Sequence, residues 1–70
     1  MSRNWEVIAV YRNKAGDVAR IVTVAGLAAG WRALTHDAAR VVAPKFDYHA
    51  GRQIRVREEG DTSIGEPYQP

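Results

Sequence analysis

Histidine and serine are the residue types of this sequence that could perform acid–base or nucleophilic chemistry. The histidines, His36 and His49, each have an aspartate nearby, but neither spacing matches a pair of metal ligands on one helix. Ser2 lies at the N-terminus and Ser63 in a predicted tail, where a rigid catalytic triad is not expected. These residues therefore give no support to an enzyme.

Carboxylates and glycines give no further sign of catalysis or of cofactor binding. Glu58 and Glu59 are adjacent, so on a strand they point to opposite sides and form no pair of acid and base. The glycine-containing turns lack the GxGxxG and GxxxxGK patterns that hold phosphates, and no cysteine is present to ligate a metal or form a disulfide. We expect a protein that is not an enzyme and has no metal and no cofactor.

Arginine is the residue type with the clearest potential for binding. Ten basic residues, mostly arginine, stand against eight acidic ones and give a net charge of +2. The guanidinium group forms paired hydrogen bonds with carboxylates and phosphates, and arginine, tyrosine and tryptophan dominate many protein interfaces. A basic stripe beside Tyr11 is conceivable, formed by Arg12, Lys14, Arg20, Arg55 and Arg57. The alternative, which we favour over nucleic-acid binding, is a solvated sheet face whose charges protect its edges and keep the domain soluble.

Three runs of residues predict the strands that position these side chains. Residues 5–12 alternate in a pattern with period two, which is typical of a strand. Residues 13–17 are turn formers and predict a hairpin with a second strand over residues 18–25. Residues 52–58 alternate again and predict a third main strand.

The segment between the second and third predicted strands admits two helix assignments. One helix could run over residues 27–43, with apolar residues at spacings of three and four. Alternatively, Thr35 caps a short helix over residues 36–43. We favour the short helix, because Gly30 would cost about 1 kcal/mol inside a helix and Thr35 begins a good first turn. Both helices end at Pro44.

These elements predict one α+β domain over residues 1–58, followed by a flexible C-terminal tail over residues 59–70. The domain is a small antiparallel sheet of three or four strands, in the order strand, strand, helix, strand, with one helix on one face. The alternative is a small SH3-like β-barrel, which is favoured if residues 26–34 form strand and loop. Because no stretch reaches the roughly 18 apolar residues of a membrane span, a cytoplasmic protein is expected.

The first predicted strand is apolar on both of its sides. Tyr11 lies on one side, whereas Ile8 and Val10 lie on the other, and a single helix can cover only one of them. The second side is covered either by the tail and the aromatic residues of the long loop or by a partner or a second copy. Trp31 is expected in the core, because a domain of this size has few large side chains to bury.

Two functions from different classes are hypothesised. The first is a small protein-binding module that occludes the surface of another protein, which would be acidic or part of a nucleic-acid-binding complex; a homodimer is also considered. The second is a nucleic-acid-binding accessory or regulatory domain that uses the arginine-bearing sheet face. The residues expected to contact the partner are Arg12, Arg20, Arg55, Arg57, Tyr11, Ile8 and Val10.

In its size and its lack of catalytic motifs, the chain resembles the small inhibitors carried by bacteriophages and mobile elements, such as anti-CRISPR proteins. Its richness in alanine and its preference for arginine over lysine are typical of a high-GC bacterial or phage genome. The resemblance involves no motif and assigns no residues. It implies an inhibitor of a host system that acts by occupying a partner surface.

Overall fold

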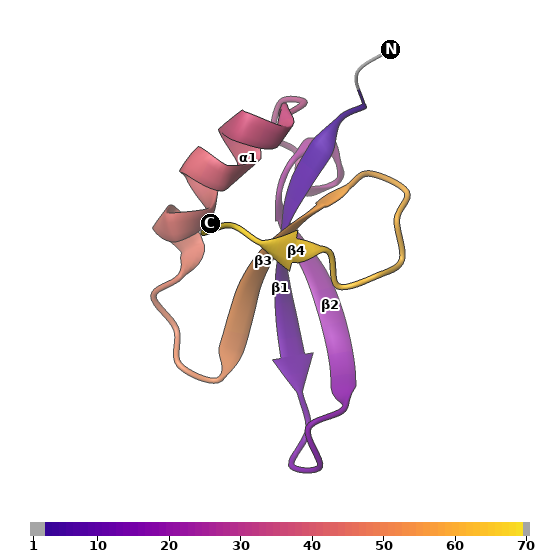
Figure 1. The fold of residues 1–70 in the computed structure, drawn as a ribbon, viewed down its shortest axis with the longest axis vertical. Coiled ribbons are helices and arrows are strands. Elements are labelled where there is room, and N and C mark those ends of the chain that lie inside the picture. The colour runs from indigo at the N-terminus through magenta and orange to yellow at the C-terminus, as the bar shows by residue number, and fades with distance from the viewer. Residues whose placement is uncertain (1–2, 70) are drawn as a thin grey trace.

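A four-stranded antiparallel sheet with one α-helix makes up the computed structural model, which describes residues 3–69. The strands β1 (Trp5–Arg12), β2 (Val18–Ala25), β3 (Arg52–Glu58) and β4 (Glu66–Pro67) lie in the order β2-β1-β3-β4 (Figure 1). All neighbouring strands run antiparallel. The predicted α+β class is therefore confirmed, and the first three strands have the predicted bounds.

The hairpin between β1 and β2 forms through the side chain of Asn13. Its Oδ1 atom accepts hydrogen bonds from the backbone N–H groups of Ala15 and Asp17, each at 3.0 Å. An asparagine side chain that bonds backbone groups two and four residues ahead closes a tight loop without any tertiary contact. The turn was accordingly predictable from the local sequence.

The helix α1 (His36–Val42) corresponds to the shorter of the two predicted helices. The Oγ1 atom of Thr35 accepts a hydrogen bond of 3.1 Å from the backbone N–H of Ala38, which is the geometry of an N-cap. A short 3₁₀ helix, η1 (Leu27–Ala29), precedes this cap, and a second, η2 (Ala43–Phe46), follows the helix.

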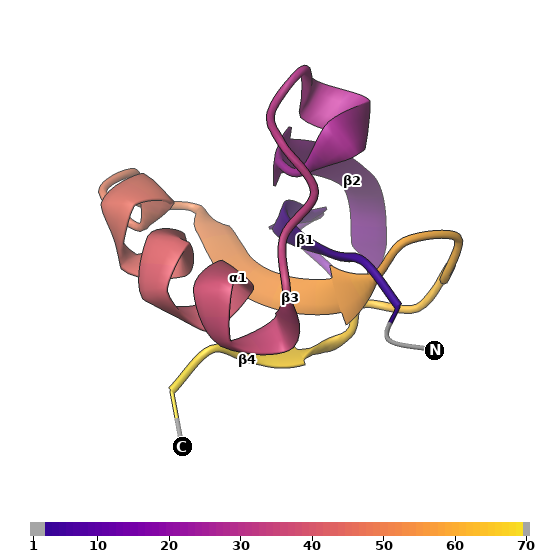
Figure 2. The same cartoon turned by 90° about the horizontal axis from the view of Figure 1, so that it is seen from above.

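The main core lies between α1 and one face of the sheet, which we call the helix face (Figure 2). Leu34 belongs to this core, and its carbonyl oxygen accepts a hydrogen bond of 2.7 Å from the N–H of Trp5. The residues that share the core come from β1, β2, β3, α1 and the segments beside the helix; they are Val7, Ala9, Ala25, Leu34, Ala39, Val42, Ala43, Ile54 and Val56.

Trp31 is not in the core, so the expectation from the sequence is wrong at this residue. The residue is 41% exposed, and its ring meets the ring of Phe46 edge-on with centroids 5.7 Å apart. Gly30, with φ of +78°, turns the chain sharply just before Trp31, and Leu34 takes the buried position instead. The local turn therefore decides which large side chain fills the core.

The opposite side of the sheet, which we call the loop face, carries the second apolar side of β1. Ile8 and Val10 are 0% and 1% exposed, so both are buried within this chain. The loop of residues 59–65 lies on this side, away from α1 (Figure 2). On the loop face, Ile8 is paired with Thr23 of β2 and with Arg55 of β3. Val10 is paired with Ile21 of β2 and with Gln53 of β3.

The segment for which the sequence predicts a flexible tail supplies the fourth strand. Strand β4 pairs with β3, and two contacts join this segment to α1. Nε2 of His36 lies 2.9 Å from Oε1 of Glu66, and Nε of Arg40 donates a hydrogen bond of 3.0 Å to the carbonyl of Tyr68. The sheet thus continues beyond residue 58, where the sequence places the end of the domain.

Candidate partner-binding surface

Arg55 and Arg57, two of the predicted partner-binding residues, bond to their own chain on the loop face. Arg55 donates from Nε and Nη2 to the carbonyls of Ile64 and Gly65, both at 2.8 Å. Arg57 donates from Nη1 to the carbonyl of Ser63 at 3.0 Å. The two guanidinium groups therefore hold the 59–65 loop against the sheet, and neither is a free, exposed cation.

Arg57 also forms the most buried ion pair of the described residues. Its Nε lies 2.7 Å from Oε2 of Glu6, and the two side chains are only 14% and 5% exposed. Removing two charges from water is costly, so such a pair persists only where each group keeps a charged partner and further hydrogen bonds. This arrangement gives Arg57 a structural role.

Three other predicted residues lie on β1, and they differ in exposure: Ile8 and Val10 are buried, whereas Arg12 is exposed. The side chains of Ile8 and Val10 are covered, so a partner cannot touch them in this conformation. Arg12 is exposed at the end of β1, where its Nη1 atom donates to the carbonyl of Gly16 at 2.8 Å within the hairpin. The sequence left open whether this chain or a partner covers the second apolar side of β1; Ile8 and Val10 are buried within this chain.

Tyr11 and Arg20 are the two predicted residues that the fold brings together on the helix face. They are paired across β1 and β2, and the guanidinium carbon of Arg20 lies 5.4 Å from the centre of the Tyr11 ring. A cation above an aromatic ring is attracted to the negative face of the ring. The fold thus places an exposed arginine over a half-buried tyrosine.

Arg52 extends this arrangement on the other side of Tyr11. It pairs with Tyr11 across β1 and β3, and its Nη1 donates to the tyrosine oxygen at 3.3 Å. Its Nη2 donates to the carbonyl of Phe46 at 2.8 Å, and its guanidinium carbon lies 5.5 Å from the centre of the Tyr48 ring. The hydrogen bond with Tyr11 raises the pKa of Arg52, so its positive charge is secure.

These contacts form a continuous group, which we call the aromatic–arginine cluster. Trp31 joins it through its edge-on contact with Phe46, and Tyr48 is its most exposed aromatic residue, at 69%. β1, β2, β3, η2 and two loops each contribute one or more members. The six residues are Tyr11, Arg20, Trp31, Phe46, Tyr48 and Arg52.

Sequence reasoning missed four members of the cluster. Trp31 was expected in the core, whereas Phe46, Tyr48 and Arg52 were not singled out as binding residues. A signal was present in the segment from Phe46 to Arg52, which places two aromatic residues and an arginine within seven residues around one loop. Aromatic residues in a loop next to arginine are a pattern of interface hot spots.

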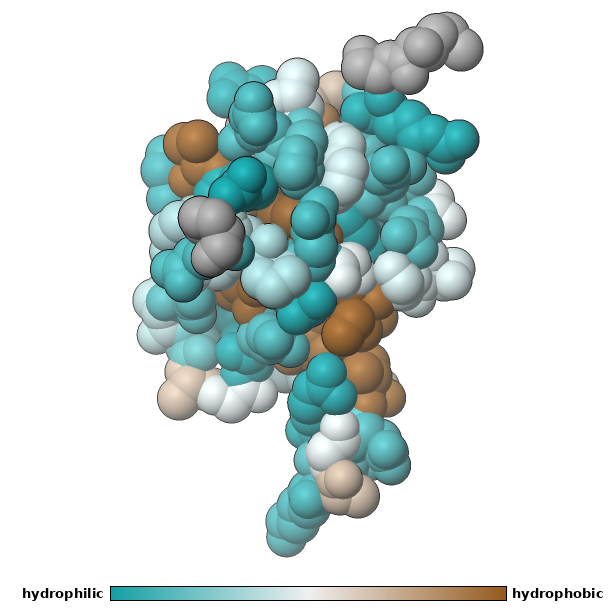
Figure 3. Space-filling model, in the orientation of Figure 1, coloured by the Kyte–Doolittle hydropathy of each residue, from teal (hydrophilic) through white to brown (hydrophobic). Residues whose placement is uncertain are grey.

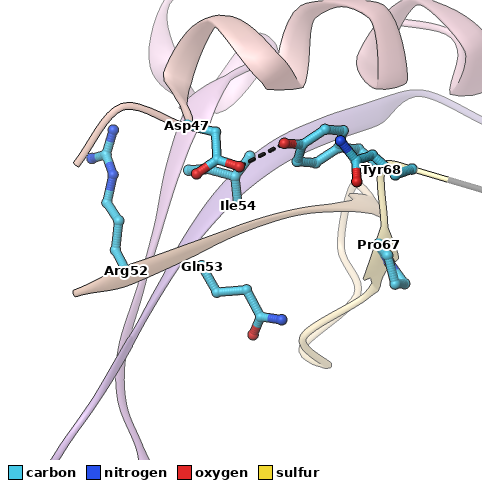
Figure 4. A pocket seen from close by; sticks show the side chains of 7 residues that line it. Asp47, Arg52, Gln53, Ile54, Pro67 and Tyr68 are labelled. Atoms are coloured by element: carbon cyan, nitrogen blue, oxygen red, sulfur yellow. Dashed lines mark hydrogen bonds between the residues drawn. The ribbon is translucent and has the colours of Figure 1, made fainter. Parts of the chain in front are cut away.

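A polar hollow of about 320 Å³ lies beside the cluster, between β3, β4 and the end of η2 (Figure 4). Arg52, Asp47 and Tyr68 are among its lining residues, and the hydroxyl of Tyr68 donates a hydrogen bond to Asp47. This bond raises the pKa of Tyr68, because it stabilises the neutral phenol next to a carboxylate. The two polar groups are therefore hydrogen-bonded to each other at the wall of the hollow.

Comparisons with protein families, with curated proteins and with solved structures find no match for this chain. Within residues 3–69, no helix is long and apolar enough to cross a membrane. The same residues bring no three histidine, aspartate or glutamate side chains together as metal ligands.

Proposed function

We propose that this protein is a protein-binding module that occludes the surface of a partner through the aromatic–arginine cluster. The observation that carries the proposal is the collection of four aromatic rings and two arginines in one continuous group of contacts. Tryptophan, tyrosine and arginine contribute much of the binding energy in protein interfaces, because they bury a large area and also form hydrogen bonds. A role as an inhibitor of a host system is part of this proposal.

Charge supports a partner with an acidic surface. Among residues 3–69, Arg20 and Arg52 form no ion pair with a carboxylate, whereas Arg57 and Arg3 do. The exposed guanidinium group of Arg20 beside the Tyr11 ring is well placed for a bidentate contact with aspartate or glutamate. Arg52 adds positive charge next to it, although its Nη1 and Nη2 atoms already donate to Tyr11 and Phe46. The partner surface is accordingly expected to carry carboxylates around an apolar centre.

Nucleic-acid binding is the alternative, and two observations weigh against it. Arg55 and Arg57, which would form the basic stripe on the sheet, are bonded to their own chain. The rings of Tyr11 and Tyr48 each carry an arginine over one face, which reduces the ring surface on which a base could stack. Both observations favour a protein partner.

Affinity capture from a bacterial lysate with matched variants tests the proposal. The proteins retained by the parent chain are compared with those retained by Arg20→Glu combined with Tyr48→Ala. The control variant, Lys14→Glu combined with Val41→Ala, changes a charge and an exposed apolar residue outside the cluster. A protein that the parent and the control retain, and that the cluster variant loses, supports the proposal.

The salt dependence of binding separates the two classes of partner. Contacts with phosphates release counterions, so the affinity for a nucleic acid falls steeply as salt increases, whereas an interface with a large apolar part responds weakly. The purified captured protein and single-stranded and duplex DNA are compared as ligands. Retention that is equal for all variants, or tight binding to DNA with a steep salt slope, would contradict the proposal.

A further inference from the structure

The sheet has two edges, and they are shielded to different extents. β4 covers part of the outer side of β3; it is only two residues long and ends at Pro67, which has no backbone N–H. β2 forms the other edge with eight residues and no proline, and within the described residues no strand lies on its outer side. Its outer backbone groups are therefore available to another chain.

The sequence of β2 favours pairing along a short stretch. Most of its residues are β-branched, and Arg20 is its only charged residue. Register shifts near both ends of the β1–β2 ladder leave a regular stretch from Arg20 to Thr23. Bulges hinder pairing at an edge, so an added strand is expected to pair with about four residues, the length of that stretch.

Both sides of this edge stretch offer contacts to an added strand. Arg20 and Val22 lie on the helix face, where α1 packs over β1 and β3, while Ile21 and Thr23 lie on the loop face. Hydrophobic surface gathers next to the 59–65 loop, over the region of β1 and β2 (Figure 3). An added strand would therefore meet an arginine on one side and apolar surface on the other.

We propose that β2 binds an extended acidic segment of the partner as an additional strand of the sheet. The inference rests on the proposed function and specifies how the partner binds. Backbone hydrogen bonds with β2 would supply affinity, while an aspartate or glutamate opposite Arg20 would supply specificity. On the helix face the added strand would lie next to Arg20, whose guanidinium group lies over the Tyr11 ring of the aromatic–arginine cluster.

Charge favours this occupant over a second copy of the chain. Two β2 strands paired antiparallel about a twofold axis would place both Arg20 side chains on the same face of the joined sheet. β2 contains no carboxylate that could neutralise them. Like charges on neighbouring strands are destabilising, whereas opposite charges stabilise the pair.

Blocked peptides with alternating residues test the proposal on the full chain. The acidic peptide is Val-Glu-Val-Glu-Val-Glu-Val, and the basic control carries lysine in place of glutamate. A third peptide has the acidic sequence with alternate backbone nitrogens methylated, which removes the hydrogen bonds of one edge. Hydrogen exchange by NMR is expected to show that the acidic peptide slows the outward-facing amides of β2, whereas the methylated peptide does not.

A charge exchange provides the specificity test. The basic peptide is expected to bind the parent about tenfold more weakly than the acidic one, and Arg20→Glu is expected to reverse this order. Because Arg20 is exposed, this substitution should leave the fold intact. Peptide-induced protection of β2 that disappears on methylation and follows the charge at residue 20 supports the proposal.

Three outcomes would overturn strand addition. The first is equal binding of the methylated peptide. The second is a set of spectral changes confined to Trp31, Tyr48 and Arg52, which would leave the proposed function standing without an added strand. The third is protection of β2 that increases with protein concentration in the absence of peptide, which would assign the edge to a second copy. Failure of the proposed function would instead appear as capture that is insensitive to the cluster.

Discussion

Nε of Arg57 lies 2.7 Å from Oε2 of Glu6, across neighbouring positions of β3 and β1, and both side chains are almost fully removed from water. Arg57 also holds the carbonyl of Ser63, so one guanidinium group links the central strand to the 59–65 loop. Arg57, which the sequence alone would place on an exposed sheet face, therefore has a role in the stability of the fold.

Removing one member of this pair is expected to destabilise the fold strongly. Glu6→Ala or Arg57→Ala leaves a buried charge without its partner, which costs about 3–5 kcal/mol of unfolding free energy. Urea denaturation monitored by tryptophan fluorescence measures the loss. Arg3→Ala is the matched control, because it breaks the exposed pair with Glu58 and should cost at most about 1 kcal/mol. Equal costs for the buried and exposed pairs would show that Arg57 is not structural.

Gly65→Ala is expected to loosen the attachment of the 59–65 loop and β4. A Cβ atom at this position would lie 2.1 Å from the carbonyl oxygen of Val56, and its φ of +67° is strained for alanine. The left-handed conformation costs about 1–2 kcal/mol, and the overlap with the backbone adds about 1–3 kcal/mol. Denaturation and limited proteolysis within residues 59–68 detect the change.

Gly60→Ala is the control for that experiment. Gly60 also has a positive φ, +85°, but a Cβ there meets nothing within 4 Å. It should therefore cost only the conformational part, about 1–2 kcal/mol. If Gly60→Ala and Gly65→Ala were equally destabilising and equally sensitive to protease, the close approach of the loop to β3 would have no energetic effect.

Thr35→Ala is expected to destabilise the protein by about 1 kcal/mol, because the N–H of Ala38 loses its hydrogen-bond acceptor. Thr35→Ser keeps a hydroxyl at the same place and should retain most of the stability. Thermal unfolding of the three proteins provides the measurement. An unchanged midpoint for Thr35→Ala would argue against the N-cap.

The raised pKa of Tyr68 predicts a dependence of stability on alkaline pH. The hydrogen bond to Asp47 stabilises the neutral phenol, so the folded-state pKa lies above the value of 10.0 for an unperturbed tyrosine. The resulting stabilisation is fully present below pH 10 and is lost as the pH rises through the folded-state pKa. NMR titration of the Tyr68 ring measures this pKa, and Asp47→Asn should bring it back toward the ordinary value. A Tyr68 pKa that does not respond to Asp47→Asn would contradict the assignment of the cause.

Short-range patterns in the sequence determined the first three strands, the hairpin turn and the start of the α-helix. The alternation of residues 5–12 and 52–58, the turn-forming residues 13–17 and the cap at Thr35 each act over a few residues, so they could be read directly. The same patterns located Tyr11 and Arg20 on neighbouring strands, and the register of β1 and β2 places them in contact.

Only the tertiary structure decided how the remaining binding candidates are used. Arg55 and Arg57 became structural because the 59–65 loop folds over the loop face and presents three carbonyl groups to them. Trp31 joined Phe46 and Tyr48 beside Arg52, because the chain turns at Gly30 and η2 continues beyond α1. These contacts join residues far apart in the chain, and their geometry depends on the packing of whole elements. No local periodicity encodes such contacts. The sequence alone determined the first three strands, the turn and the helix cap. The packing of the loop and the helix against the sheet decided which side chains remain exposed.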